Sequence, residues 1–212
     1  MSEKSYIVVE GVIGAGKTSL AELLAAELNA AVQLEVVEKN PFLEDFYRDM
    51  RSFAFQTQIF FLLSRYKQQM ELVQRDLFSE RVVSDYLFAK DRIFANLNLD
   101  DRELVLYDHL ADLLERDIPK PDVVVYLQAS TDILMKRIRK RGRSYEHDMP
   151  RDYIAALNEA YNYFFFHYNQ TPLLVVNTDD IDFVANQDDL KELTEAIDAH
   201  ESGTSYYLPV RE

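Results

Sequence analysis

The sequence predicts an α/β protein, a three-layer sandwich in which a five-stranded parallel sheet is covered by helices on both faces. Two observations lead to this fold. Short apolar runs rich in Val, Ile and Leu alternate along the chain with longer amphipathic segments, and a glycine-rich stretch follows the first of these runs. Because parallel neighbours need long crossover connections, which helices provide, the alternation favours a parallel sheet.

Each predicted element has its own pattern. The strands are short runs of aliphatic and aromatic residues, predicted at 6–10, 32–37, 81–85, 122–128 and 172–177. The helices carry apolar residues three and four positions apart, at 17–28, 52–75, 102–116, 131–141 and 151–168. Pro150 and Asn186 are typical of helix starts and Gly142 of a helix end. We expect residues 201–212 to form a surface tail.

Length, composition and charge limit the possible classes of protein. The 212 residues, of which 48% are hydrophobic, suffice for one domain over 1–212 with a single core. Cysteine is absent and no signal-like segment precedes Tyr6, so we expect a cytoplasmic protein. Its apolar runs are too short to span a membrane. A net charge of −14 disfavours nucleic acid as a partner, because most of the surface would repel a polyanion.

The glycine-rich stretch GVIGAGKTS, at 11–19, matches the pattern G-x-x-x-x-G-K-[ST] between a predicted strand and a predicted helix. Glycines let successive backbone N–H groups face an anion, and the helix adds its positive N-terminal end. This predicts a P-loop NTPase-type fold, with a plain glycine-rich turn as the alternative. The expected ATP-binding residues are Gly11, Val12, Ile13, Gly14, Ala15, Gly16, Lys17, Thr18 and Ser19.

Three side chains near this loop have predicted roles. Lys17 is expected to reach the β- and γ-phosphates of ATP, where it supports catalysis, and Thr18 to ligate Mg²⁺. Asp85 ends the third predicted strand and is the expected second Mg²⁺ ligand. An ordinary helix cap is the alternative interpretation of Asp85.

The segment EVVEKNP, at 35–41, points to the acceptor of the phosphoryl group. Here the chain resembles the deoxynucleoside kinase family, and especially its bacterial deoxyguanosine kinase-like branch, from Tyr6 to about Asp198. The resemblance implies that Glu35 is catalytic and acts on the 5′-hydroxyl of a deoxynucleoside, with Glu38 as the rival. A carboxylate within hydrogen-bond reach can orient an attacking alcohol and accept its proton.

Two further segments resemble the family's nucleobase site. In AFQTQIFFLLSRYKQ, the resemblance implies that Gln58 and Arg65 meet the base, whereas a polar stripe on an amphipathic helix is the alternative. Seven residues span about two helical turns, so both side chains emerge on one face. Gln56 does not have this seven-residue spacing to Arg65, so Gln58 is the favoured glutamine. In KDRIFAN, Asp91 matches a polar residue at the base and Phe94 an aromatic residue beneath it, with core packing as the alternative for Phe94.

The sugar site and the lid complete the resemblance. Tyr47 and Glu146 match the family residues at the sugar 3′-hydroxyl, although Tyr47 also suits simple packing. The basic stretch RIRKRGR resembles the family lid, which would span about 137–147 and whose catalytic, phosphate-facing arginines would be Arg137, Arg141 and Arg143. Cations that interact with a helix C-terminus are the alternative.

One motif departs from the family pattern. The usual D/E-R-S/T after the third strand reads Asp85-Tyr86-Leu87, so the family arginine is missing. The deoxyguanosine kinase-like branch also has Asp-Tyr here, with a lysine four residues beyond the tyrosine, and Lys90 occupies that position. We expect Lys90 to supply the missing positive charge.

Together these patterns predict a Mg²⁺-dependent kinase that transfers the γ-phosphoryl group of ATP, or another nucleoside triphosphate, to the 5′-hydroxyl of a purine deoxynucleoside, with deoxyguanosine as first candidate. A deoxyadenosine/deoxycytidine kinase, a nucleoside monophosphate kinase and a non-catalytic nucleotide-binding regulator are the alternatives. The resemblance also implies a homodimer, to which helices 52–75 and 102–116 could contribute the interface.

Overall fold

The computed structural model describes residues 4–75, 81–146, 149–179 and 181–208. Its sheet has six strands in the order β2-β3-β1-β4-β5-β6, and every neighbouring pair is parallel. The parallel α/β fold is therefore confirmed, but the predicted number of five strands is wrong by one. The strands are β1 Tyr6–Gly11, β2 Ala31–Gln33, β3 Val82–Ser84, β4 Val123–Gln128, β5 Leu173–Asn177 and β6 Thr204–Tyr207.

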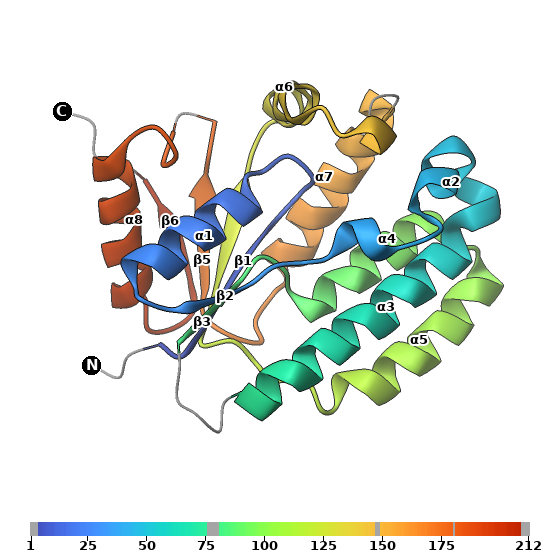
Figure 1. The fold of residues 1–212 in the computed structure, drawn as a ribbon, viewed down its shortest axis with the longest axis horizontal. Helices are drawn as coiled ribbons and strands as arrows, with labels where there is room; N and C mark the ends of the chain where they lie inside the picture. The colour runs from blue at the N-terminus through green and yellow to red at the C-terminus, as the bar shows by residue number, and fades with distance from the viewer. Residues whose placement is uncertain (1–3, 76–80, 147–148, 180, 209–212) are drawn as a thin grey trace.

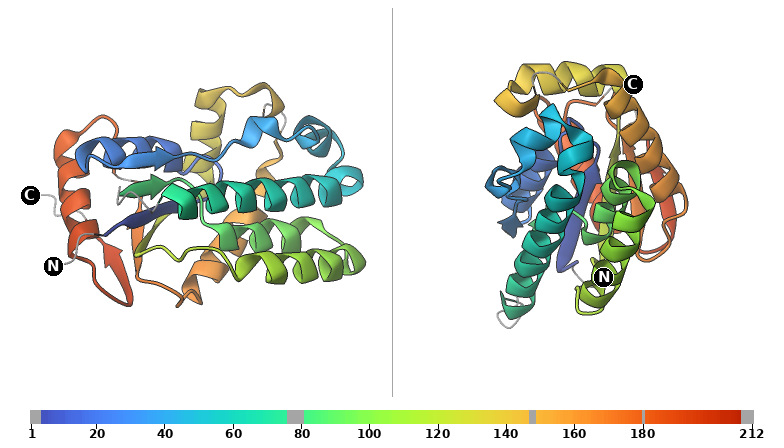
Figure 2. Two further views of the ribbon diagram at one scale, coloured as in Figure 1. Left: turned by 60° about the horizontal axis from the view of Figure 1, so that its bottom comes forward. Right: turned by 90° about the vertical axis from the view of Figure 1, so that its right-hand side faces the viewer.

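Helices form the two outer layers (Figure 1). The α-helices are α1 Lys17–Glu27, α2 Leu43–Arg48, α3 Met50–Arg75, α4 Asp91–Asn98, α5 Asp101–Glu115, α6 Thr131–Arg141, α7 Arg151–Phe166 and α8 Gln187–Ala199. Short 3-10 turns lie at η1 Val37–Lys39, η3 Phe88–Lys90 and η4 Ser144–Glu146. Figure 1 and Figure 2 show α1 and α8 on one side of the sheet and α3, α4, α5 and α7 on the other.

The central strands carry the main core. Consecutive residues of β1 and β4 are fully buried, such as Val8 and Val9 in β1 and Val124 and Val125 in β4. Since successive side chains of a strand point to opposite faces, both faces of the sheet are covered. A smaller cluster around Leu62 joins α3, α4 and α5. The sheet is therefore a rigid support for the loops at the carboxyl ends of its strands.

The predicted helix ends are confirmed. Pro150 caps the start of α7, and Gly142 ends α6 with a φ of 67°, a left-handed conformation that glycine adopts without strain. The side chain of Asn186 accepts a hydrogen bond from Asp188 N at the start of α8. Separately, the described helices include none with the length and apolar content needed to cross a membrane.

Two expectations about strands need correction. β2 ends at Gln33 and not at residue 37, because the chain turns out of the sheet where the Asp85 carboxylate accepts a hydrogen bond of 2.6 Å from Glu35 N. The predicted tail contributes β6, whose Thr204 and Tyr207 pair in register with β5. Edge strand β6 is largely exposed and has no apolar run, so its sequence carries little strand signal.

Candidate active site

The glycine-rich loop needs its glycines for two physical reasons. Gly14 and Gly16 have φ values of 88° and 100°, which residues with a side chain rarely adopt. A Cβ atom on Gly11 would lie 2.7 Å from the backbone oxygen of Leu127, so the close approach of β1 to β4 excludes a side chain there. The loop therefore presents its backbone at the start of α1, where an anion would meet the helix N-terminus.

Lys17 and Thr18 lie where this loop becomes helix α1. Lys17 Nζ donates hydrogen bonds to Gly11 O at 2.8 Å and Val12 O at 3.3 Å. Burial and, next, the charge of Lys90 lower the pKa of the Lys17 ammonium. Among the other loop residues, Val12 and Ala15 are buried in the core, whereas Ser19 is exposed. Of the loop, Ile13, Lys17 and Thr18 line the cavity described below.

Thr18 and Asp85 meet as a pair of oxygen donors. The Thr18 hydroxyl donates a 2.6 Å hydrogen bond to Asp85 Oδ2. Hard oxygen ligands suit Mg²⁺, which binds few protein groups and completes its shell with water and phosphate oxygens. Within the described ranges no cluster of three or more His, Cys, Asp or Glu side chains could hold a metal alone. The pair therefore fits a Mg²⁺ ion that arrives with a nucleotide.

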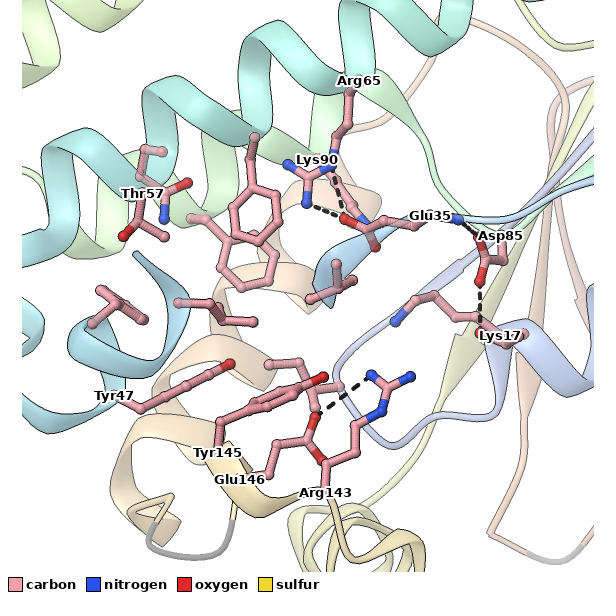
Figure 3. Close-up of a pocket in the computed structure, with 18 of the residues that line it drawn as sticks. Lys17, Glu35, Tyr47, Thr57, Arg65, Asp85, Lys90, Arg143, Tyr145 and Glu146 are labelled. Carbon is pink, nitrogen blue, oxygen red and sulfur yellow. Dashed lines mark hydrogen bonds and ion pairs between the residues drawn. The ribbon is translucent and has the colours of Figure 1, made fainter. Parts of the chain in front are cut away.

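A cavity of about 820 Å³, counted to its open mouth, lies between this loop, α3 and the segment after α6. Figure 3 shows acidic and basic side chains on one wall and the aromatic rings of Tyr47 and Tyr145 on another. Polar and apolar side chains are mixed in the lining. The lining residues used below are Lys17, Thr18, Glu35, Tyr47, Gln58, Phe61, Arg65, Asp85, Lys90, Phe94, Arg141, Arg143, Tyr145, Glu146, Tyr153 and Tyr161.

Glu35 is the centre of the charged wall. Its Oε1 accepts hydrogen bonds from Arg65 Nε at 2.8 Å and from Arg65 Nη2, and its Oε2 accepts one from Lys90 Nζ at 2.8 Å. Burial raises the pKa of the Glu35 carboxyl, but the charges of Arg65 and Lys90 outweigh burial and hold that pKa well below its usual range. Glu35 is therefore an ionised, oriented carboxylate. The side chain of its rival Glu38 lies outside the described part of the structure.

The predicted nucleobase residues converge from α3 and α4. Gln58 and Arg65 both line the cavity, and Gln58 is only 2% exposed. Asp91 lies behind this wall, where it forms an ion pair with Arg65. Phe94 lines the cavity and packs edge-on against Tyr161, with ring centroids 6.1 Å apart. The seven-residue spacing predicted that Gln58 and Arg65 share a helix face, and the family resemblance, not the spacing, pointed to a common site.

Tyr47 and Glu146 line the other end of the cavity. The ring of Tyr47 stacks on that of Tyr145, with centroids 6.0 Å apart. Burial, followed by the charges of Tyr153 and Glu146, raises the pKa of Tyr47 well above its ordinary value, so its hydroxyl stays neutral. Glu146 is buried and pairs with Arg141 at 2.6 Å.

The three predicted lid arginines take two different positions. Arg141 and Arg143 line the cavity, and Arg143 Nη1 lies 3.9 Å from Glu146 Oε1. Arg137 lies against the glycine-rich loop instead, where it donates to Ala15 O at 3.4 Å and to Thr178 O at 2.7 Å. Its phosphate-facing role stays a prediction. Residue 147, the predicted end of the lid, lies outside the described residues.

Several residues of the site were missed by the motifs. Phe61 lines the cavity, and the Arg65 guanidinium lies 4.5 Å from its ring centroid. Tyr145 and Tyr153 add aromatic surface from η4 and α7. Glu10 lies beneath the charged wall, fully buried at the end of β1. An acidic residue at the end of an otherwise apolar strand was the one sequence signal for Glu10.

Comparison with known proteins identifies similar chains. The family model described as deoxynucleoside kinase matches residues 7–201. A deoxyguanosine kinase of Bacillus subtilis is 35% identical over 198 residues, which cover 91% of this chain and 96% of that protein. A deoxyadenosine kinase of Lactobacillus acidophilus is 34% identical over 206 residues, which cover 91% of this chain and 94% of that protein.

Solved structures of deoxyadenosine kinases are also similar to this chain. The structure of a deoxyadenosine kinase from M. mycoides with bound dATP superposes with a TM-score of 0.77 at 25% identity, covering 92% of this chain and 100% of that one. The structure of a deoxyadenosine kinase from M. mycoides with bound dCTP gives a TM-score of 0.76 at 26% identity, covering 90% and 97%. The structural similarity therefore extends over about nine tenths of the chain.

Proposed function

The chain belongs to the deoxynucleoside kinase family, and from this premise we propose that it transfers the γ-phosphoryl group of ATP to the 5′-hydroxyl of a purine deoxynucleoside. The position of Glu35 carries the proposal. Its carboxylate lies on the wall of a cavity that the phosphate-binding loop also borders. A phosphoryl acceptor bound there would place an alcohol between this carboxylate and the nucleotide.

The hydrogen bonds of Glu35 leave room for that alcohol. A carboxylate has about four lone-pair sites. Arg65 donates twice to Oε1 and Lys90 once to Oε2, so Oε2 retains capacity for one more donor. The 5′-hydroxyl donates to this oxygen. Because the pKa of Glu35 is held low, the carboxylate orients the hydroxyl early and receives its proton only as the new bond forms.

The reaction is an in-line displacement at phosphorus. The 5′-oxygen forms a bond to the γ-phosphorus, the bond to the β,γ-bridging oxygen breaks, and ADP leaves with that bond's electron pair. Thr18 and Asp85 would hold Mg²⁺, which when bound neutralises phosphate charge. Lys17 binds the β- and γ-phosphates, and Arg141 and Arg143 supply guanidinium donors from the lid to the oxygens of the transferred group.

The substrate class follows from the lining and from the relatives. Gln58 presents a donor and an acceptor to a base edge, while Phe61 and Phe94 supply rings for contact with its faces. Deoxyguanosine is the first candidate because the Bacillus subtilis relative is a deoxyguanosine kinase. Deoxyadenosine is the second, since the Lactobacillus acidophilus relative acts on it by name. A monophosphate acceptor is disfavoured because Glu35 would repel its phosphate.

The enzyme works as a homodimer. Leu63 of α3 is 50% exposed, and on α5 Val105, Leu106 and Leu113 are 58%, 50% and 60% exposed. Exposed aliphatic side chains of two adjacent helices are what a helix-pairing interface buries. The location of the protein in the cytoplasm stays a prediction of its cysteine-free composition.

A phosphoryl-transfer assay tests the function. The purified protein is incubated with Mg²⁺, γ-labelled ATP and each of the four deoxynucleosides, and labelled monophosphate is measured. We expect the fastest transfer to deoxyguanosine. Transfer to a deoxynucleoside monophosphate and to none of the four deoxynucleosides would overturn the proposal.

A pair of variants tests the role of Glu35. Glu35→Gln removes the charge that meets the attacking alcohol, so we expect kcat to fall by at least about a hundredfold. Glu44→Gln, on the 67%-exposed side chain of α2, is the matched control and should keep full turnover. Thermal stabilisation by deoxyguanosine verifies that Glu35→Gln still folds and binds. Full turnover in Glu35→Gln would refute the acceptor assignment.

A further inference from the structure

Glu10 is a carboxylate in the centre of the core. It stands between the apolar residues of β1 and Gly11, and its side chain is 0% exposed. Transfer of an ionised carboxylate from water to such a place costs several kcal/mol or more unless the group is paired and hydrogen-bonded. Its partners therefore indicate what the carboxylate does.

Four groups surround the Glu10 carboxylate. Oε1 accepts hydrogen bonds from Gly11 N at 2.9 Å and from the Tyr161 hydroxyl at 3.3 Å. Oε2 accepts one from Leu87 N at 2.8 Å and lies 3.6 Å from Lys90 Nζ. A single side chain thus connects the first amide of the phosphate-binding loop with the turn after β3 and with the lysine of η3.

Lys90 is held between two carboxylates. Its ammonium lies 2.8 Å from Glu35 Oε2 and 3.6 Å from Glu10 Oε2, and the lysine side chain is only 2% exposed. Glu35 borders the cavity, whereas Glu10 lies below it, covered by the first turn of the loop and by Tyr161. The two acids therefore differ in position: Glu35 lines the cavity, whereas Glu10 contacts Lys90, two backbone amides and the Tyr161 hydroxyl.

We propose that Glu10 is a positioning residue for phosphoryl transfer, which fixes the ammonium of Lys90 so that Lys90 holds Glu35 in the orientation that meets the acceptor alcohol. The inference rests on the proposed function of Glu35. A long lysine side chain has several rotamers, and a second buried anion restricts its ammonium to one place. The same carboxylate fixes the start of the loop, so the acceptor and donor sides of the site keep a constant separation.

A double-mutant cycle tests this role. Glu10→Gln, Lys90→Met and the double variant are compared with the unmodified enzyme for kcat, for KM of deoxyguanosine and of ATP, and for thermal stability. If Glu10 acts through Lys90, Glu10→Gln lowers kcat by about tenfold or more in the unmodified background but by less than about twofold in the Lys90→Met background. Both KM values should stay within about threefold.

A purely structural role gives a different pattern. If Glu10 only supports folding, Glu10→Gln would lower kcat by the same factor in the unmodified enzyme and in the Lys90→Met variant. It would also lower thermal stability by the same amount in both. This additivity would overturn the inference. If Glu10→Gln does not fold, Glu10→Asp replaces it in the cycle, since it retains the charge but withdraws the carboxylate by one methylene. For Glu10→Asp we again expect a larger loss of kcat in the unmodified background than in the Lys90→Met background. An equal loss in the two backgrounds would again overturn the inference.

The outcome is separable from the test of function. An unmodified enzyme that transfers no phosphoryl group to any deoxynucleoside would refute the proposed function itself. If the unmodified enzyme is active but the effects of Glu10→Gln and Lys90→Met on kcat are additive, only the role of Glu10 is refuted. The role of Glu35 is tested separately, by Glu35→Gln and its control Glu44→Gln.

Discussion

Lys90 Nζ lies 2.8 Å from Glu35 Oε2, although the two residues are far apart in the chain and belong to different segments, Lys90 to η3 and Glu35 to the loop after β2. Tyr86, which stands where the family motif has arginine, is fully buried, and its hydroxyl accepts a 3.1 Å hydrogen bond from Gln33 Nε2. The positive charge beside Glu35 is thus supplied by Lys90, together with Arg65 from α3.

Replacement of Lys90 tests this arrangement. Lys90→Met leaves Glu35 with Arg65 as its cationic partner, so the carboxylate loses the group that holds Oε2. We expect kcat to fall by about tenfold to a hundredfold, with KM for deoxyguanosine changed much less. Steady-state kinetics measure both constants. Lys191→Met, on the exposed face of α8, is the control. Unchanged turnover in Lys90→Met would show that catalysis does not need the charge of Lys90 beside Glu35.

Gln58 is the predicted contact to the nucleobase. Gln58→Ala removes a buried amide from the cavity wall, so the efficiency kcat/KM for deoxyguanosine should fall by about ten- to a hundredfold. Gln56→Ala is the matched control, because Gln56 is the same residue type two positions away and donates to Ser52 O on its own helix. Equal losses in the two variants would contradict the predicted base contact.

The proposed Mg²⁺ site is the pair of oxygens on Thr18 and Asp85. Thr18→Ala removes the hydroxyl that lies 2.6 Å from Asp85 Oδ2. We expect the Mg²⁺ concentration for half-maximal activity to rise by about tenfold, because one inner ligand is lost. Titration of activity with Mg²⁺ measures this shift, and a chelator should abolish turnover. Ser52→Ala, at an exposed residue of α3 outside the cavity lining, should titrate like the unmodified enzyme. A Thr18→Ala enzyme with unchanged Mg²⁺ dependence would exclude Thr18 as a ligand.

The proposed dimer interface is the exposed aliphatic surface of α3 and α5. Leu106→Asp introduces a charge on α5, which also exposes Val105 and Leu113, and a charge at a helix-pairing interface is costly to bury. In size-exclusion chromatography with light scattering, the unmodified protein should elute as a dimer and the variant as a monomer. Leu208→Asp, at a residue that is 77% exposed, should leave the dimer intact. A dimeric Leu106→Asp protein would place the interface elsewhere.

Stability should fall at alkaline pH. Burial raises the pKa of Tyr6 from 10.0 to about 12, while the hydrogen bond from Gln69 acts in the opposite direction. The folded state therefore holds the phenolic proton more tightly than the unfolded chain. Its contribution is fully present below pH 10.0 and is lost as pH rises to about 12, a change of up to about 3 kcal/mol.

Urea unfolding across this pH range tests the prediction. Tyr6→Phe should show a smaller loss of unfolding free energy between pH 10.0 and about 12 than the unmodified protein. Tyr206→Phe, at a residue that is 64% exposed, should retain the full loss. Parallel curves for the Tyr6→Phe variant and the unmodified protein would show that Tyr6 does not titrate as expected.

Local pattern was enough for much of the fold and part of the site. Apolar runs predicted β1, β3, β4 and β5 closely, because these strands are largely buried and their composition reflects it. Helical periodicity predicted α6, because one side of this helix is buried and the other side is exposed. Helix spacing alone placed Gln58 and Arg65 on one face. By contrast, β6 was missed because an exposed edge strand needs no apolar run, and β2 was overextended because a side chain elsewhere in the chain diverts its end.

By itself, the sequence determined the phosphate-binding loop, since its glycines and the lysine and threonine that follow are adjacent in the chain and their chemistry is local. Only the tertiary structure decided the acceptor side. There Glu35, Arg65 and Lys90 come from three segments. Beneath them, Glu10 contacts Lys90 from the neighbouring strand β1. The interaction between buried charges depends on distances of a few ångströms, and these distances are set by how the strands and helices pack together. The spacing of residues along the chain does not contain these distances.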